Sequence, residues 1–108
     1  MKRGAVVIAA TGSGYGGKPR PYVVIQAESY VPPTIILVGC SSPEDRPIGV
    51  RPRLPPTADN GLDKFSEVMV DIPVTVKREQ IHQVVGELNE AEMAEVDGAL
   101  MLILGLSS

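Results

Sequence analysis

Short apolar runs separated by glycine and proline occupy the first three quarters of the chain, and they predict strands. Three of these runs are continuous and rich in β-branched residues, which fit a buried, pleated surface. They cover residues 5–9, 22–26 and 34–38. The run at 34–38 is the most apolar of the three, so we expect it at the centre of a sheet.

Two later segments predict strands with interruptions. Residues 48–54 form an edge strand at most, because Pro52 has no N–H to donate to a neighbouring strand. Residues 67–72 and 74–76 favour either a pair of strands or one strand that bends at Pro73.

Near the C-terminus the apolar spacing changes to that of a helix. Asn89 is a favourable N-cap, and Glu92 three residues later completes a capping box. Apolar residues then recur at helical spacing, which predicts one buried stripe. The stripe consists of Met93, Val96, Leu100, Ile103 and Leu104. Gly105 ends the helix, since glycine readily adopts the left-handed conformation found there.

Together these elements predict a single domain over residues 1–108. The fold class is mainly β, with a C-terminal α-helix: a small twisted β-barrel of about five to seven short strands closed by that helix. The composition agrees, because 11 glycines and 10 prolines in 108 residues supply too many turns for a helical bundle. A chain of this length has room for one hydrophobic core.

The counts of two residue types exclude several kinds of site. One cysteine excludes an internal disulfide bond and a cysteine-based zinc site, and one histidine excludes a histidine cluster. The longest apolar run is too short to cross a membrane, and the N-terminal run is too short for a signal peptide. We therefore expect a soluble, cytoplasmic protein that does not bind a membrane.

The net charge of −3 hides an uneven distribution. Residues 1–53 carry seven Lys and Arg against three Asp and Glu, a balance of +4, whereas residues 54–108 carry three against ten, a balance of −7. A basic half can bind phosphate groups while an acidic half keeps the molecule soluble, although an unevenly charged, solvated surface has the same pattern. The overall acidity disfavours tight non-specific binding of nucleic acid, which needs several phosphate contacts.

A glycine-rich segment joins the first two predicted strands. Residues 12–17 match the G-x-G-x-x-G pattern of dinucleotide-binding proteins, and with Lys18 they come close to a phosphate-binding P-loop. Both motifs must open a helix, whereas this segment leads through Pro19 into a strand. We therefore interpret it as a mobile loop that can close over a ligand.

Two places in the sequence carry candidate chemistry. Arg20 lies between Pro19 and Pro21, where a restricted backbone aims a guanidinium group that can bind phosphate through two hydrogen bonds. Ser41 and Ser42 follow the third predicted strand, and strand ends often carry function. Taken alone, Arg20 is also compatible with an ordinary surface arginine, and the serines with hydroxyls that satisfy a turn.

Cys40 and His82 carry weaker signals. A lone cysteine in this position is typical of a small, buried apolar side chain, and no base is identifiable beside it. His82 has no partner motif and is more simply a structural or surface histidine. We assign neither of them a catalytic role.

Five short motifs follow one another along the chain at a specific spacing. They are Gly4–Val7, Pro19–Ile25 after the glycine loop, Val38–Ser42, Val68–Val76 and Glu87–Leu106. In this order they resemble the MazF/PemK-type toxins of toxin–antitoxin pairs. That family has an opening strand, a loop, an R-P strand, a third strand ending near a hydroxyl, a late strand with an aspartate, and a terminal helix. The resemblance covers nearly the whole chain.

The resemblance implies a fold and an activity. The family's fold is a small β-barrel with a C-terminal helix, assembled as a homodimer. Its activity is sequence-specific cleavage of single-stranded RNA without a metal or another cofactor. The ribose 2′-hydroxyl attacks the adjacent phosphate, which leaves a 2′,3′-cyclic phosphate and a 5′-hydroxyl. The partner is a cognate antitoxin whose acidic tail blocks the RNA groove.

The same resemblance implies roles for individual residues. Arg20 stabilises the charge that builds on the phosphoryl oxygens, and Ser41 holds the phosphate for in-line attack. The candidate substrate-binding residues are Tyr15, Lys18, Ser42, Arg46, Arg51 and Arg53. Tyr15 offers a ring for base stacking, and the arginines offer phosphate contacts. The general base stays open, with Glu28 or another arginine as alternatives.

The sequence departs from the family pattern in several places, and the serine at position 41 together with the acidic net charge keeps a second function open. Ser41 stands where threonine is usual, the first loop lacks the carboxylate or histidine of many relatives, and Asp71 is followed by Ile72 rather than the frequent glutamine. The alternative function is a non-catalytic module of toxin shape that inhibits a protein target. A CcdB-type poison acts through a C-terminal aromatic tail and is disfavoured, because this chain has no tryptophan.

Overall fold

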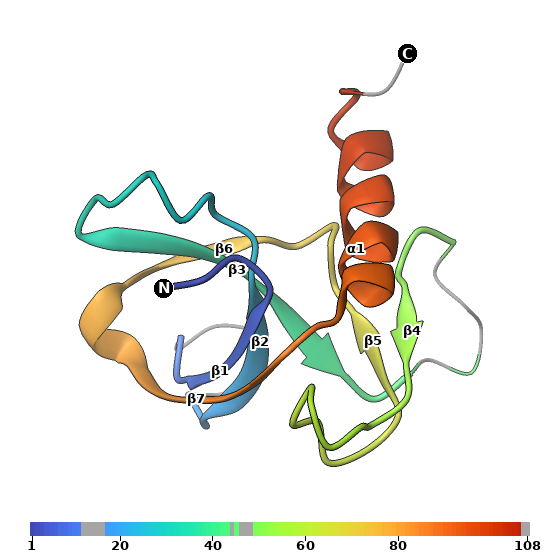
Figure 1. Ribbon diagram of the computed structural model, residues 1–108, viewed down its shortest axis with the longest axis horizontal. Coiled ribbons are helices and arrows are strands. Elements are labelled where there is room, and N and C mark those ends of the chain that lie inside the picture. The colour runs from blue at the N-terminus through green and yellow to red at the C-terminus, as the bar shows by residue number, and fades with distance from the viewer. Residues whose placement is uncertain (12–16, 44, 46–48, 107–108) are drawn as a thin grey trace.

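The described part of the molecule contains seven strands, one short 3₁₀ helix and one α-helix, and all strand pairs are antiparallel (Figure 1). The computed structural model describes residues 1–11, 17–43, 45 and 49–106. In chain order the elements are β1 (Ala5–Ala9), β2 (Arg20–Val24), β3 (Thr34–Ser41), β4 (Arg53–Leu54), β5 (Ser66–Val68), β6 (Val74–Lys77), η1 (Arg78–Gln80), β7 (Ile81–Glu87) and α1 (Glu90–Ile103). The expected mainly β fold with a C-terminal helix is confirmed.

Strand β3 is central, as its apolar run predicts. The strand order is β4-β5-β3-β2-β1-β7, and β6 also pairs with β3. Leu37 is opposite Val74 in β6, and Cys40 is opposite Val68 in β5. The two β3 positions are three residues apart, whereas their partners in the segment 68–74 are six residues apart. The extra residues bulge away next to Pro73, which has no N–H to donate. Of the two predicted alternatives, one continuous strand is wrong: the segment forms two strands, β5 and β6, which pair with β3 rather than with each other.

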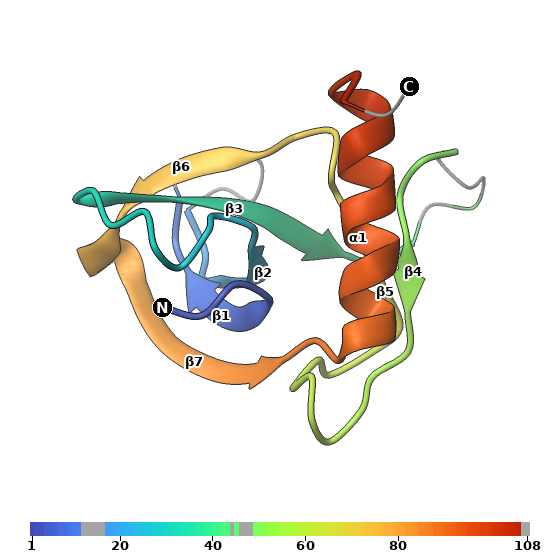
Figure 2. The ribbon, with the colours of Figure 1, turned by 45° about the horizontal axis from the view of Figure 1, so that its top comes forward.

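The curled sheet buries both faces of its central strands (Figure 2). Alternate residues of β1, β2 and β3 belong to two separate apolar clusters. The cluster under α1 includes Val6, Val23, Val38, Val96 and Leu100. The other cluster includes Val7, Val24, Leu37 and Val76. Burial on both faces explains why these strands are continuous apolar runs rather than alternating ones.

Helix α1 begins and ends as its sequence predicts. The side chain of Asn89 accepts a hydrogen bond from Glu92 N at 2.7 Å, and Glu92 Oε1 accepts one from Asn89 N at 2.9 Å, which completes the capping box. Gly105 has φ +71°, and Leu106 N donates to Met101 O, as in a Schellman C-terminus. Within the described residues, no helix is long and apolar enough to cross a membrane.

The predicted apolar stripe of α1 is right except at its end. Val96 and Leu100 are buried, and Met93 and Ile103 pack against the same cluster. Leu104 is exposed, so its predicted burial is wrong. The last turn of α1 projects beyond the sheet in both ribbon views (Figures 1 and 2).

Strand β7 is the element that the sequence pattern does not predict. Its exposed His82 and Gln83 interrupt the apolar residues, and pairing with β1 holds the segment as a strand. Several other strands differ from their predicted bounds: β3 continues to Ser41 instead of ending at residue 38, and β5 covers only Ser66–Val68. β2 begins at Arg20 instead of residue 22, and β4 shortens to two residues at the sheet edge.

A close backbone contact fixes the connection between β4 and β5. Gly86 of β7 lies directly beneath this connection, and a Cβ there would stand 2.5 Å from Asp59 O. The buried side chain of Asn60 accepts a hydrogen bond from Leu62 N and donates one to Glu92 Oε2 at 3.0 Å. Strand β7 and the N-terminal cap of α1 therefore hold the connection in place.

Candidate active site

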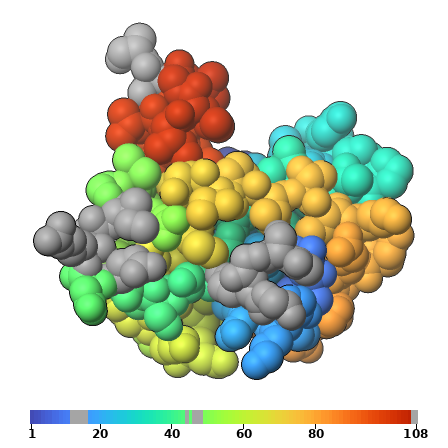
Figure 3. All heavy atoms as spheres, turned by 180° about the vertical axis from the view of Figure 1, so that it is seen from behind, coloured from blue at the N-terminus to red at the C-terminus, as the bar shows by residue number. Residues whose placement is uncertain are grey.

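An open cavity of about 460 Å³ lies where three segments of the chain meet. The segments are the start of β2 with its Pro-Arg-Pro sequence, the end of β3, and residues 61–66, which run from the β4–β5 connection into the first residue of β5, and Ile8 of β1 completes the lining. The lining residues are Ile8, Pro19, Arg20, Pro21, Cys40, Ser41, Ser42, Gly61, Leu62, Asp63, Lys64 and Ser66. Seen from behind, the blue segment that enters β2 and the yellow-green β4–β5 connection lie along the same edge of the molecule (Figure 3).

The sheet register brings Arg20 and Ser41 together. β2 and β3 are antiparallel with Tyr22 opposite Gly39, and Arg20 and Ser41 each lie two residues beyond this pair. Arg20 is exposed, Ser41 is half-buried, and both line the cavity. A guanidinium group and a hydroxyl group therefore face one cavity from adjacent strands.

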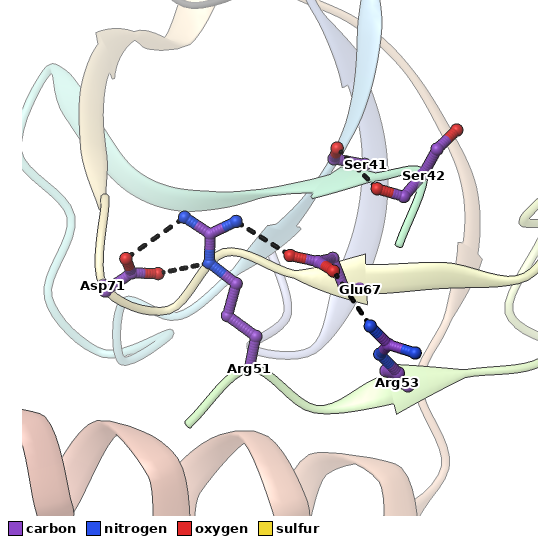
Figure 4. Close-up of polar contacts among 6 residues, drawn as sticks. All are labelled: Ser41, Ser42, Arg51, Arg53, Glu67 and Asp71. Carbon is purple, nitrogen blue, oxygen red and sulfur yellow. Dashed lines mark hydrogen bonds and ion pairs between the residues drawn. The ribbon is translucent and has the colours of Figure 1, made fainter. Parts of the chain in front are cut away.

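The two serines at the end of β3 differ in their surroundings. Ser41 is the last residue of the strand, and its backbone pairs with Glu67 in β5. Its Oγ donates a hydrogen bond of 3.2 Å to the carbonyl oxygen of Ser42 (Figure 4). Ser42 lies one residue beyond the strand and is exposed. The sheet thus fixes the backbone of Ser41 more firmly than that of Ser42.

The β4–β5 connection adds polar groups that the sequence analysis does not single out. Asp63, Lys64 and Ser66 line the cavity, and Lys64 gives it a second cation in addition to Arg20. The one local signal is the Asn60-Gly61 dipeptide, which is typical of a turn but does not indicate what the turn faces. These residues reach the cavity only through the packing of the connection against β7 and α1.

Arg51 belongs to an ion-pair cluster (Figure 4). Its Nε and Nη2 donate to the two carboxylate oxygens of Asp71 at 2.7 and 3.1 Å, and its Nη1 donates to Glu67 Oε2 at 2.8 Å. Arg53 Nη2 stands 3.8 Å from the other oxygen of Glu67. The side chains of Arg51 and Glu67 are 9% and 1% exposed.

The cluster has electrostatic and positional consequences. The hydrogen bond from Arg51 lowers the pKa of Asp71. The hydrogen bond to Asp71, supported by Glu67, raises the pKa of Arg51 despite the desolvation that opposes it. Glu67 pairs through its backbone with both Ser41 and Arg53, so the cluster supports the strand next to Ser41. Neither Arg51 nor Arg53 lines the cavity.

Of the remaining candidate substrate-binding residues, two lie at or next to the cavity and two lie outside the described part of the chain. Ser42 lines the cavity, and Lys18 is exposed just before its Pro19 wall. Tyr15 and Arg46 lie outside the described residues. In the part of the chain that the structure describes, no group of three or more His, Cys, Asp or Glu side chains is placed to hold a metal ion.

Cys40 lines the cavity, but its thiol is not suited to act as a nucleophile. Its side chain is buried, and burial raises the pKa of the thiol to about 12. The thiolate is the nucleophilic form of cysteine, so this thiol is inert at neutral pH. The sequence-based expectation of a small, buried apolar side chain is confirmed.

Comparison with known proteins shows which family has this sequence and fold. Residues 2–104 match the family described as PemK-like, MazF-like toxin of type II toxin–antitoxin system. The chain is 36% identical to a protein of Mycolicibacterium smegmatis named probable endoribonuclease MazF, over 99% of both chains.

Solved structures share the fold at lower sequence identity. An endoribonuclease in complex with its cognate antitoxin from Mycobacterial species has a TM-score of 0.83 at 22% identity, covering 100% of this chain and 98% of that one. The Mycobacterium tuberculosis toxin MazF-mt6 has a TM-score of 0.80 at 18% identity, covering 96% and 99%. Because the family match and the curated relative both span nearly the whole chain, this protein belongs to the PemK-like, MazF-like toxins of type II toxin–antitoxin systems.

Proposed function

We propose that the protein is the toxin of a toxin–antitoxin pair and that it cleaves single-stranded RNA. The observation that carries the proposal is the meeting of Arg20 and Ser41 in one open cavity. The relative from M. smegmatis, named a probable endoribonuclease, supports the same activity. An open cavity suits an unpaired strand, whose phosphates and splayed bases are accessible.

The proposed reaction takes place within the RNA. The ribose 2′-oxygen attacks the adjacent phosphorus, the bond from phosphorus to the 5′-oxygen breaks, and the products are a 2′,3′-cyclic phosphate and a 5′-hydroxyl. Negative charge builds on the non-bridging oxygens, where the Arg20 guanidinium can donate two parallel hydrogen bonds. The Ser41 hydroxyl holds the phosphate in line, and Lys64 contributes a second positive charge.

Incubation of the purified protein with a long single-stranded RNA in EDTA tests the activity without metal. We expect new ends at a limited set of sequences, with 5′-hydroxyls that accept label from polynucleotide kinase without prior dephosphorylation. Fragments with 5′-phosphates would contradict the mechanism. Intact RNA from a folded protein that still arrests growth would instead favour the alternative, a module that inhibits a protein target.

Removing the hydroxyl of Ser41 should slow cleavage more than removing that of Ser42. We expect a loss of about 10–100-fold for Ser41→Ala, the effect of one lost hydrogen bond to a charged group, and a much smaller loss for Ser42→Ala. Ser41→Thr keeps the hydroxyl and should keep the activity or raise it. Initial rates on a fluorogenic oligoribonucleotide measure all three. A Ser42→Ala variant slower than Ser41→Ala would exchange the two roles.

A cognate antitoxin with an acidic tail is the expected partner, and its tail should compete with RNA. Structures similar to this chain include the complex with a cognate antitoxin and a MazE–MazF from Deinococcus radiodurans. The balance of +4 in residues 1–53 gives an acidic tail an attractive surface. A peptide of that tail should displace a fluorescent 2′-O-methyl RNA, and salt should weaken both ligands. A tail that binds while the RNA stays bound would contradict competition.

The exposed end of α1 supports a homodimer. Met101, Leu102, Leu104 and Leu106 are between 42% and 74% exposed, on the part of the chain that projects beyond the sheet (Figure 1). A cluster of exposed apolar side chains is typical of an association surface. We expect sedimentation velocity to show a dimer at micromolar concentration and Leu102→Glu to shift it toward monomer. A monomeric wild type at that concentration would argue against the dimer.

A further inference from the structure

We propose that Asp63 is the proton acceptor of this cavity and takes the proton of the ribose 2′-hydroxyl as cleavage begins. The assignment rests on the proposed function, because it needs an RNA strand in the cavity. It supplies the general base that the sequence leaves open between Glu28 and an arginine.

Asp63 is the one carboxylate among the described residues that line the cavity. The other ionisable lining residues are two cations, Arg20 and Lys64, and the buried thiol of Cys40. Burial keeps that thiol protonated, since its pKa is raised to about 12. A carboxylate is an ordinary general base in enzymes, and it is the group in this set that is suited to accept a proton.

The carboxylates considered elsewhere are differently placed. Glu28 lies in the β2–β3 connection and does not line the cavity. Glu67 and Asp71 accept hydrogen bonds from Arg51 in the ion-pair cluster (Figure 4). Asp63 is exposed, and none of the ion pairs found in the described part of the chain involves it. Its carboxylate is therefore accessible to a substrate hydroxyl.

The backbone on both sides of Asp63 is held in place. On one side Leu62 is buried, and its N–H donates a hydrogen bond of 3.0 Å to Asn60 Oδ1. On the other side Ser66 Oγ donates one of 2.8 Å to the carbonyl oxygen of Lys64. Because the backbone is anchored, the Asp63 carboxylate can move only by rotation about its side-chain bonds. This restriction keeps it close to the cavity that Arg20 and Ser41 line.

The proton transfer balances within the cleavage reaction. The 2′-O–H bond breaks, and its proton passes to a carboxylate oxygen of Asp63. The electron pair left on the 2′-oxygen forms the new bond to phosphorus. The bond from phosphorus to the 5′-oxygen then breaks, and that oxygen takes a proton from water. Asp63 returns its proton to solvent after the products leave, so the enzyme is regenerated.

Asp63→Asn tests the assignment, because it removes the base and keeps the volume of the side chain. We expect kcat on a fluorogenic oligoribonucleotide to fall about 10²–10⁴-fold, the usual contribution of a general base. The acid limb of the pH profile of kcat/KM should disappear, since no carboxylate is left to protonate there. Asp63→Glu should retain that limb at a reduced rate. Binding of the 2′-O-methyl oligonucleotide, followed by fluorescence anisotropy, should not weaken.

Asp59→Asn is the matched control, because Asp59 is an exposed carboxylate of the same connection that does not line this cavity. It should cleave at the wild-type rate. A wild-type kcat in Asp63→Asn, or an acid limb that survives in it, would overturn the assignment and leave the proposed function standing. An equal loss in binding of the methylated oligonucleotide would make Asp63 a binding residue and overturn it as well. A wild-type protein that cleaves no RNA would overturn the proposed function and this assignment together.

Discussion

Replacement of Arg20 with alanine should lower the rate of RNA cleavage about 10²–10³-fold, the effect of removing one hydrogen-bond donor from the charge of a transition state. The fold should survive the change, because Arg20 is exposed and belongs to neither apolar cluster. Single-turnover cleavage measures the loss, and a thermal melt checks the fold.

Two further variants separate the geometry of Arg20 from its charge. Arg20→Lys keeps the charge but cannot make the planar two-bond contact with phosphate, so it should recover only part of the rate. Lys77→Ala removes one exposed cation that does not line the cavity and should leave the rate unchanged. Full activity in Arg20→Ala would remove Arg20 from the site.

The second large effect concerns stability. Arg51→Met should lower the free energy of unfolding by about 3–5 kcal/mol, because it takes the close partner from a buried carboxylate. Glu67 is 1% exposed, and Arg53 Nη2 stands 3.8 Å from its carboxylate. Methionine fills much of the space of the arginine stem, so the loss reports the charge more than a cavity. Urea denaturation gives the free energy.

A surface ion pair and a double variant serve as controls for this prediction. Lys2 and Glu87 are 67% and 51% exposed, so Lys2→Met should cost less than about 1 kcal/mol. Glu67→Gln in the Arg51→Met background should cost less than the two single losses added, since the two side chains contact each other directly. A loss in Arg51→Met as small as that of Lys2→Met would mean that Glu67 is stabilised adequately without Arg51.

The elements that the sequence predicts well depend on residues that are neighbours in the chain. The first strand has its predicted bounds, Ala5–Ala9, because a β-branched run is a local property. The capping box of Asn89 and Glu92 and the end of α1 at Gly105 are equally local, since each involves backbone groups within one helical turn.

Arg20 and Ser41 could be predicted in part from the sequence and in part only from the tertiary structure. The prolines around Arg20 and the strand end at Ser41 mark both residues in the sequence, and the family resemblance links them. Only the pairing of β2 with β3 brings the start of one strand and the end of the other to the same cavity. Both residues line one cavity, and their catalytic roles remain predictions for the variants above.

The sequence by itself determined the strand runs, the capped helix and the two candidate residues at the strand ends. Tertiary structure alone decided three other features. β7 is a strand because it pairs with β1, Arg51 turns to Glu67 and Asp71, and Asp63 and Lys64 reach the cavity. In each case the stabilising partner is distant in the chain. A polar side chain takes its position from the partner that satisfies its charge or hydrogen bonds, and local spacing carries no record of where that partner lies.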